Sequence, residues 1–223
     1  MKHFLITVLC LSLLCIPVRS AEPEKLVALT FDDGPSGRFT RTLLEGLEER
    51  DTKATFFLCG YRMEQDPALT ERIFREGHEI GLHGYSHKCM KDMCQADIEQ
   101  ELQRAAALLP AGCQVSFLRS PGGLCSKYVK SAAKKLDLAV LSWSVDPKDW
   151  AKTDADAIEK EVIDHVRDGD IILLHDMSDS SVKATLMIID ELLEEGFRFV
   201  TVSELAQAKS ITPVPGTEYR RFG

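Results

Sequence analysis

Two adjacent carboxylates, Asp32 and Asp33, stand where an apolar run of the sequence ends in a turn. Residues 26–31 have the composition of a buried strand, and the dipeptide Gly34-Pro35 that follows is a turn signal. Consecutive side chains of an extended chain point in opposite directions, so the two carboxylates can take different roles at one site. Taken alone, the stretch is also explained by an Asp-Gly turn with solvated carboxylates.

Two histidines, His83 and His87, follow the apolar stretch 79–82 and are four residues apart. Histidines at this spacing can share one face of a helical turn and bind one metal ion. A surface pair without a ligand is the alternative. The zincin motif is excluded, because its mechanism needs a glutamate base at the position occupied by Gly84.

Three later segments also place polar side chains directly after apolar runs. They are Arg119-Ser120-Pro121-Gly122-Gly123, Asp146-Pro147-Lys148-Asp149-Trp150 and His175-Asp176. Each has an ordinary structural explanation when taken separately: a capping arginine, a loop aspartate, a core tryptophan or a histidine with satisfied hydrogen bonds. The positions of these segments relative to the surrounding strands and helices decide whether they have such structural roles or form one functional site.

Apolar runs alternate with amphipathic segments from Leu26 to about Ala206. Strands are expected at 26–31, 54–59, 79–82, 115–118, 138–145, 170–174 and 198–202. Helices are expected near 39–50, 67–76, 96–109, 126–136, 154–167, 182–195 and 203–208. This alternation predicts a single α/β domain with a parallel sheet, closed or nearly closed into a (β/α) barrel of seven or eight strands.

The polar segments share one location in such a barrel. The C-terminal ends of all parallel strands open on one face, where these folds place their active sites. The first, third, fourth, fifth and sixth expected strands each end in ionisable residues, which indicates one composite site. By contrast, His78 precedes a strand and His165 lies within a helix, so we assign structural or surface roles to both.

The ordered series T-F-D-D-G-P, H-x-x-x-H, R-x-P-x-G, D-x-x-D-W and I-x-L-x-H resembles the polysaccharide deacetylases, the NodB-homology domain or carbohydrate esterase family 4. The resemblance covers roughly residues 25 to 206, and five motifs in order make it specific. It implies an irregular barrel, in agreement with the alternation of strands and helices.

Residue by residue, the resemblance implies that Asp33, His83 and His87 bind a divalent metal ion, with zinc expected first and cobalt, nickel or manganese as alternatives. Two histidines and one carboxylate leave coordination positions open for water and for a substrate oxygen. Asp32 would be the general base and His175 the general acid that protonates a leaving amine.

The remaining roles implied by the resemblance are supporting ones. Arg119 would orient Asp32, and Asp149 would orient His175. Gly122, Trp150 and Leu173 would bind the substrate, with the Gly122 N–H as an oxyanion donor.

The sequence departs from the family pattern at two motifs. Gly84 stands where the family usually has Thr or Ser, a hydroxyl that helps to brace the metal loop. Ser120 and Gly122 replace a proline and an aromatic residue, and loss of the aromatic ring removes one wall of the groove. We therefore do not transfer a substrate preference from any one family member.

The N-terminus has the pattern of a secretory signal peptide. Lys2 and His3 precede the apolar run 4–16, which is too short for an ordinary transmembrane helix and is followed by acceptable cleavage positions before Ala21. The expected organisation is a signal peptide at 1–20, the catalytic domain at 21–210 and a patternless tail at 211–223 that packs over the surface or frays. A secreted or periplasmic protein without stable membrane insertion follows.

The mature chain is acidic. Without Lys2 and Arg19 it has 25 basic and 35 acidic residues, a net charge of about −10. An acidic domain without a cluster of Lys and Arg argues against nucleic acid or an anionic membrane as a partner. We expect an N-acetylated glycan as substrate and a monomeric protein.

Five cysteines remain after cleavage, and an odd number in an exported protein requires at least one free or intermolecular thiol. An extended run of about 3.3 Å per residue between Cys113 and Cys125 would hold them too far apart for a disulfide. Any bridge is expected within the trio Cys89, Cys94 and Cys125. Cys59, in an apolar run, is expected to be a buried free thiol.

Three functions are consistent with these motifs. The first is a secreted metal-dependent N-deacetylase of glycans that contain N-acetylglucosamine, such as peptidoglycan or chitin fragments. The second is an O-deacetylase of the acetylxylan type, because the same site can cleave esters. The third is a catalytically silent carbohydrate-binding protein, against which the presence of both Asp32 and His175 argues.

Overall fold

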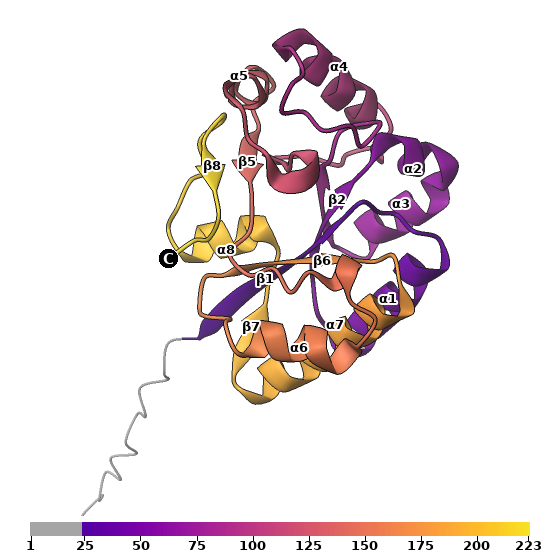
Figure 1. The fold of residues 1–223 in the computed structure, drawn as a ribbon, viewed down its shortest axis with the longest axis vertical. Coiled ribbons are helices and arrows are strands. Elements are labelled where there is room, and N and C mark those ends of the chain that lie inside the picture. Colours follow the sequence, from indigo (N-terminus) through magenta and orange to yellow (C-terminus); the bar gives the residue numbers. More distant parts are fainter. Residues whose placement is uncertain (1–23) are drawn as a thin grey trace, which may run out of the picture.

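The computed structural model describes residues 24–223 and shows a parallel sheet that is curled into an irregular barrel and surrounded by helices (Figure 1). The strands are β1 (Lys25–Asp32), β2 (Thr55–Leu58), β3 (Glu79–Leu82), β4 (Phe117–Leu118), β5 (Ala139–Leu141), β6 (Ile171–His175), β7 (Phe197–Phe199) and β8 (Glu218–Tyr219). The expected signal peptide at 1–20 lies outside the described residues. Within 24–223 no helix is long and apolar enough to span a membrane.

Within residues 24–223, eight helices and two 3₁₀ turns connect the strands. The helices are α1 (Arg38–Glu49), α2 (Gly60–Gln65), α3 (Pro67–Arg75), α4 (Gln95–Ala106), α5 (Lys127–Lys135), α6 (Ala155–Ile163), α7 (Asp179–Glu194) and α8 (Val202–Ala208). The 3₁₀ turns are η1 (Pro121–Gly123) and η2 (Asp149–Ala151).

The strands lie in the order β6-β1-β2-β3-β4-β5-β8, and β7 pairs with the first part of β1. All ladders between named strands are parallel, so the C-terminal ends of β1 to β6 meet at one end of the barrel. Beyond β5 the chain returns to β6, where Val145 forms a parallel bridge with Ile172. This bridge joins the two sides of the curled sheet, and the barrel predicted from the sequence is confirmed.

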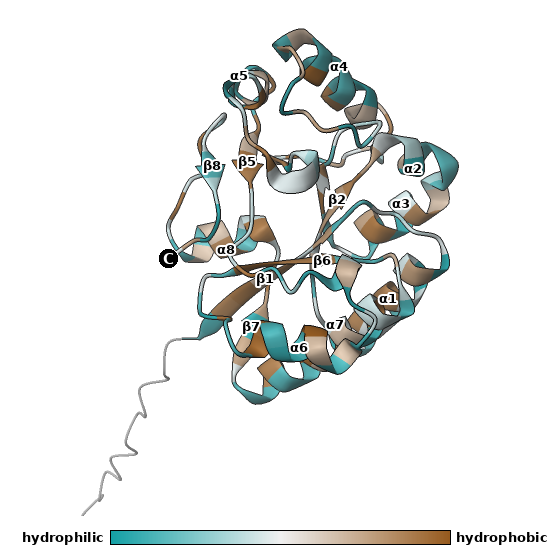
Figure 2. Cartoon of the chain, in the orientation of Figure 1, coloured by the Kyte–Doolittle hydropathy of each residue, from teal (hydrophilic) through white to brown (hydrophobic). Residues whose placement is uncertain are grey.

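Alternation along β1 determines which side chains reach the barrel interior. Val27, Leu29 and Phe31 pack in the cluster that joins the sheet to the outer helices, whereas Leu26 and Ala28 belong to the inner cluster. Because the strand period is two residues, Thr30 and Asp32 continue the inner row of Leu26 and Ala28. Figure 2 shows hydrophobic residues along most of the strands, with the hydrophilic β8 as an exception, and a mixture of hydrophobic and hydrophilic residues along the helices.

Helix boundaries follow local capping. Asp66 accepts the N–H of Leu69 at 3.0 Å at the start of α3, as the Asp-Pro signal in the sequence predicts. Ser178 accepts the N–H of Ser181 at 3.0 Å and starts α7 at Asp179, three residues before the expected boundary. The serine cap therefore sets the start of the helix, whereas apolar spacing alone places it at residue 182.

The structure differs from the sequence expectations at a strand end and adds one helix, and it decides between the two alternatives for the tail. The strand expected to reach residue 145 ends at Leu141, because the next residues cross over to β6. Helix α2 was not predicted. The tail does not fray: β8 pairs with β5, and Phe222 is fully buried.

All five cysteines of the described region are free thiols. The disulfide expected within the trio Cys89, Cys94 and Cys125 is therefore not found, and Cys113 is not bonded to Cys125. Cys59 is fully buried, as predicted.

Candidate active site at the C-terminal ends of the strands

Asp32 and His175 are paired across adjacent strands. They are Cα partners in the parallel ladder between β1 and β6, so their side chains emerge on the same side of the sheet. Both line one cavity of about 420 Å³ at the strand ends. The residues proposed as base and acid therefore face the same space.

Arg119 fixes the Asp32 carboxylate by a hydrogen bond from inside the barrel. Its Nη1 donates to Oδ1 of Asp32 at 2.7 Å and to Oγ1 of Thr30 at 2.8 Å. Its Nη2 donates to the carbonyl of Ser142 at 2.9 Å. The side chain is 0% exposed, so its charge is compensated inside the barrel by the Asp32 carboxylate.

An aromatic ring completes the surroundings of Arg119. The guanidinium lies 4.2 Å from the centre of the Phe57 ring, a cation–π distance. On the neighbouring strand Gly81 makes room for this ring, since a Cβ at that position would come within 2.4 Å of it. The arginine is thus immobilised by packing as well as by hydrogen bonds.

Asp33, His83 and His87 present three ligand atoms that lie within 4.8 Å of one another. The Nε2 atoms of His83 and His87 are 3.2 and 2.8 Å from Oδ1 of Asp33. That oxygen is buried, and neither imidazole meets it with hydrogen-bond geometry. A buried oxygen without a hydrogen bond, facing two imidazole nitrogens, fits a divalent cation.

The hydrogen bond of His83 and the charge of Asp33 also suit a cation. Nδ1 of His83 lies 2.8 Å from the carbonyl oxygen of Arg119, which can only accept, so Nδ1 donates to it and Nε2 is the ring nitrogen that faces Asp33. Burial raises the pKa of Asp33, but the interactions with His83 and His87 outweigh it and hold the pKa far below its usual value. The carboxylate is therefore ionised at neutral pH.

His175 is held by a buried aspartate. Its Nδ1 lies 2.8 Å from Oδ1 of Asp149, and its backbone N–H donates to Oδ2 of Asp149 at 2.8 Å. Burial lowers the pKa of His175, but the hydrogen bond and charge of Asp149, together with the charges of Asp32 and Asp33, raise it to about 9. At neutral pH this imidazole is protonated and can donate a proton.

The ion pair between His175 and Asp149 predicts how the protonation of His175 and the stability of the protein depend on pH. In the metal-free protein, an NMR titration should give His175 a pKa of about 9, and Asp149→Asn should lower it by more than about one unit, because the counter-charge is lost. The pair's contribution to stability is fully present below the usual pKa of 6.5 and is lost as the pH rises through about 9. An unchanged His175 titration in Asp149→Asn would contradict the assigned pairing.

The structure brings the predicted site residues together. Eight of them line the cavity: Asp32, Asp33, His83, His87, Gly122, Trp150, Leu173 and His175. Arg119 lies behind Asp32, and Asp149 lies behind His175. Their roles in the reaction stay predictions, since position alone does not show them.

Sequence reasoning gave no site role to four further residues. Trp143 and Asp146 line the same cavity, and Thr30 contacts Arg119. Asp176 is fully buried, and burial raises its pKa to about 7. It accepts hydrogen bonds from Thr40 and, at 3.3 Å, from Ser36, which ties the end of β6 to the turn after Asp33. Strand alternation could have identified Thr30, and Asp146 and Asp176 stand in polar segments that follow apolar runs of the sequence, whereas Trp143 depends on packing.

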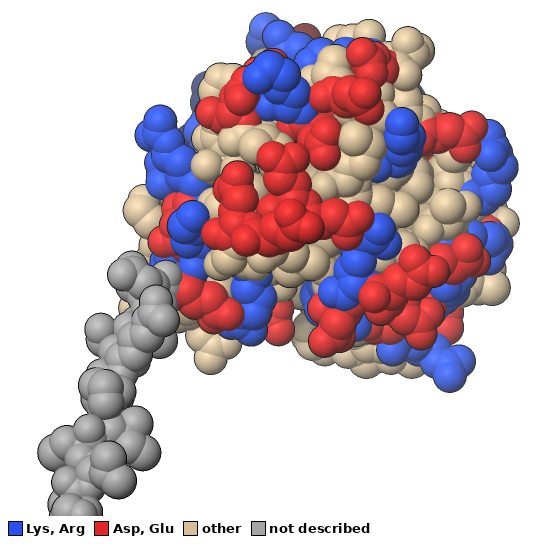
Figure 3. Space-filling view, turned by 90° about the horizontal axis from the view of Figure 1, so that it is seen from below, with Lys and Arg blue, Asp and Glu red and all other residues tan. Residues whose placement is uncertain are grey.

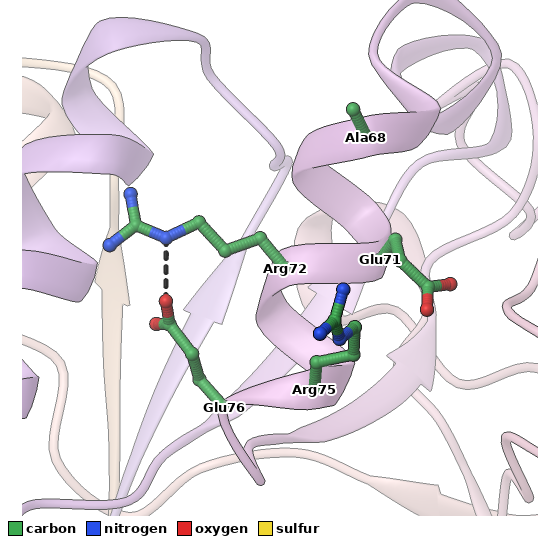
Figure 4. A pocket seen from close by; sticks show the side chains of 5 residues that line it. All are labelled: Ala68, Glu71, Arg72, Arg75 and Glu76. Carbon is green, nitrogen blue, oxygen red and sulfur yellow. Dashed lines mark hydrogen bonds and ion pairs between the residues drawn. The ribbon is translucent and has the colours of Figure 1, made fainter.

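A cavity of similar size on α3 lacks this chemistry (Figure 4). It has a volume of about 300 Å³ and is lined by Ala68, Glu71, Arg72, Arg75 and Glu76, with a 2.6 Å ion pair between Arg72 and Glu76. These side chains lie on and just after one surface helix, and none is a histidine. The histidine and aspartate side chains that could bind a metal ion or transfer a proton line the cavity at the strand ends.

The motifs are shared with known proteins. A sequence profile of the polysaccharide deacetylases matches residues 19–141. The chain is 35% identical over 192 residues to a peptidoglycan-N-acetylglucosamine deacetylase of Bacillus cereus, which covers 83% of this chain and 90% of the relative. This chain belongs to the polysaccharide deacetylase family. It is therefore an enzyme of the hydrolase class, a carbohydrate deacetylase.

Two further comparisons agree with the family. A chitooligosaccharide deacetylase of Sinorhizobium fredii is 34% identical over 195 residues, with 80% of this chain and 91% of the relative covered. The structure of a family 4 acetyl xylan esterase from Clostridium thermocellum, in complex with a cobalt ion, superposes with a TM-score of 0.83 at 33% identity. That match covers 88% of this chain and 98% of the esterase chain. The resemblance stated from the five motifs is confirmed.

Proposed function

We propose that this deacetylase is a secreted, metal-dependent enzyme that hydrolyses the acetamide bond of N-acetylglucosamine units in peptidoglycan or chitin-type oligosaccharides. The observation that carries the proposal is the arrangement of Asp32 and His175 around one cavity beside Asp33, His83 and His87. The names of the Bacillus and Sinorhizobium relatives support this substrate class.

Asp33, His83 and His87 would hold the divalent cation, with zinc expected first. When bound, such an ion acidifies water and polarises a carbonyl group. The chain's contribution is to present two imidazole nitrogens and one ionised carboxylate, with Asp32 beside them. The separation of Nε2 of His83 from Oδ2 of Asp32 is 3.8 Å, so the proposed base lies next to the ligand set.

The hydrolysis needs two proton transfers, one performed by Asp32 and the other by His175. Asp32 accepts a proton from water as the water oxygen forms a bond to the acetyl carbon. Arg119 fixes the orientation of this carboxylate through its 2.7 Å hydrogen bond to Oδ1. As the C–N bond breaks, His175 donates its proton to the nitrogen, which leaves as the free amine while acetate is released. Asp149 stabilises the protonated imidazole before the transfer.

The state of His175 favours amide over ester hydrolysis. An amine is a poor leaving group unless it is protonated, and a histidine with a pKa raised to about 9 is protonated at neutral pH. The O-deacetylase alternative has support from the likeness to an acetyl xylan esterase. The silent carbohydrate-binding alternative leaves the buried pairs Asp32–Arg119 and His175–Asp149 without a purpose.

The proposed location rests on the sequence. The N-terminal pattern of 1–20 is that of an export signal, and the proposed glycans are extracytoplasmic. Figure 3 shows acidic and basic side chains intermingled on one face of the molecule, with no continuous basic patch there. The proposed protein is monomeric, with an N-acetylated glycan rather than nucleic acid as its partner.

An acetate-release assay tests the proposed substrate. The purified enzyme is incubated with chitooligosaccharides, peptidoglycan and acetylxylan, and acetate and free amine are both measured. Release of acetate with an equal amount of amine supports the N-deacetylase. Acetate from acetylxylan alone would establish the esterase instead, and no release from any of the three would favour the binding protein.

Metal removal is expected to abolish turnover. Treatment with a chelator followed by dialysis should reduce acetate release below about 1% of the untreated rate, because metal ions contribute several kcal/mol to such reactions. Readdition of zinc or cobalt should restore it. His83→Ala should lose bound metal, measured by elemental analysis, whereas His165→Ala on the surface should not. Full activity of the metal-stripped enzyme would refute the metal site.

A further inference from the structure

The loop that carries His83 and His87 is held in an unusual conformation. Its residues belong to no helix or strand. Gly84 has φ of 77° and His87 has φ of 58°, and the left-handed region is costly for a histidine. A hydroxyl at position 84 is absent, because that residue is glycine. The loop therefore depends on partners in other elements to keep its shape.

Helix α2 holds one side of the loop. The backbone N–H groups of Gly60 and Tyr61 donate to the carbonyl oxygens of Gly84 and Tyr85, each at 2.9 Å. The Tyr85 hydroxyl donates to Oε2 of Glu64 at 2.6 Å. These bonds engage the carbonyl groups of the loop and leave its amide groups to be satisfied elsewhere.

A single carboxylate oxygen on α4 satisfies those amides. Oε2 of Glu101 accepts the backbone N–H of Tyr85 at 3.0 Å, the backbone N–H of Ser86 at 2.7 Å and the Ser86 hydroxyl at 2.8 Å. Hydrogen bonds to an ionised acceptor are stronger than neutral ones. Glu101 thereby fixes the residue that directly precedes His87.

The helix that carries Glu101 is itself firmly placed. Ile98, Leu102 and Ala105 are fully buried on its inner face. Arg104 of the same helix lies 3.6 Å from the centre of the Tyr85 ring. Glu101 is not part of the Asp33, His83 and His87 set, so it acts on the loop and not as a ligand.

We propose that Glu101 is a positioning residue that sets the spacing of His83 and His87 and thereby the affinity for the metal. This inference rests on the proposed metal site. Loss of a partner that orients metal ligands typically weakens metal binding by about 10–100-fold. Glu101→Ala should weaken zinc binding by this amount, because the loop amides lose their shared acceptor.

The test measures the zinc dissociation constant by competition with a chromophoric chelator. Glu101→Ala, Glu101→Gln and the matched control Glu99→Ala are compared with the unsubstituted chain. Glu99 lies on the same helix and carries the same charge, but its partners are Gln95 and Lys135. We expect the control to bind zinc within about threefold of the original, and Glu101→Gln to lie between the original and Glu101→Ala, since an amide oxygen still accepts.

Two results would overturn the proposal. One is a folded Glu101→Ala with unchanged zinc affinity. The other is equal weakening in Glu101→Gln and Glu101→Ala, which would show attraction between a distant charge and the cation instead of positioning. Circular dichroism of the zinc-free variants establishes that each is folded. In cobalt-loaded protein, the visible absorption spectrum of Glu101→Ala should also change, as the ligand geometry relaxes.

A variant that does not fold leaves the proposal testable. If Glu101→Ala is unfolded, Ser86→Ala removes one of the three donors while the carboxylate stays, and its zinc affinity should fall by about tenfold. Unchanged affinity in both Ser86→Ala and Glu101→Gln would refute the role of Glu101. Failure of the unsubstituted chain to bind zinc would instead refute the metal site, so the two failures are distinguishable.

Discussion

Asp32→Asn is expected to lower the rate of N-acetyl hydrolysis by about 10²–10⁴-fold, the usual contribution of a general base. Asparagine has almost the same shape and its carbonyl oxygen can still accept from Arg119, but it cannot take a proton from water. Metal binding should remain, because the ligand set is Asp33, His83 and His87. The measurements are kcat by acetate release and bound zinc by elemental analysis.

The substitution also removes the counter-charge of a buried arginine. Arg119 is fully buried, and loss of one partner from a buried pair costs about 3–5 kcal/mol. Activity is therefore measured well below the melting temperature of the variant. Asp146→Asn serves as the control, since Asp146 lines the same cavity without contacting Arg119, and its loss should stay below about tenfold. If Asp32→Asn kept a tenth or more of the turnover, the base would have to be another group.

The sequence predicted the fold because its signals are local and repeated. Apolar runs such as 26–31 and 79–82 become parallel strands of the barrel, and the polar residues after them share one end because all these strands run in the same direction. Asp32 and His175 are the last residues of their strands, and Asp33, His83 and Arg119 directly follow strand ends. Their convergence therefore required only the correct element order.

What the sequence did not predict depends on contacts between distant segments. β8 is a two-residue strand whose pairing is supplied by β5, so no periodic pattern marks it. Trp143 reaches the cavity because the chain leaves the sheet after Leu141 and crosses to β6. Glu101 is one of several glutamates on amphipathic helices, and only its three hydrogen bonds distinguish it.

The tolerance of the barrel interior for charge also depends on packing. A buried arginine is unfavourable unless its donors and its charge are compensated. Here the guanidinium of Arg119 donates hydrogen bonds to the carbonyl oxygens of Leu141 and Ser142, the Thr30 hydroxyl and the Asp32 carboxylate. The sequence places Arg119 at a strand end, but the compensation comes from two other strands.

His175→Ala is expected to separate substrates by their leaving groups. Hydrolysis of N-acetylated glycan should fall by about 10²–10⁴-fold, because the amine leaves without a proton donor. Hydrolysis of an activated ester such as p-nitrophenyl acetate should fall by less than about tenfold, because nitrophenolate leaves without protonation. The measurement is kcat/KM for both substrates at a pH below 8, where the original histidine is protonated.

The experiment must separate the loss of the proton donor, His175, from the effect of leaving the Asp149 carboxylate without its partner. In His175→Ala the buried carboxylate of Asp149 loses the imidazole that it contacts at 2.8 Å, which costs stability. The double variant with Asp149→Asn removes that unpaired charge and should show the same preference for the activated ester. Equal losses on the amide and the ester in both variants would show that His175 positions the substrate or shapes the cavity. A loss confined to the amide leaves proton donation to nitrogen as the step that this histidine performs.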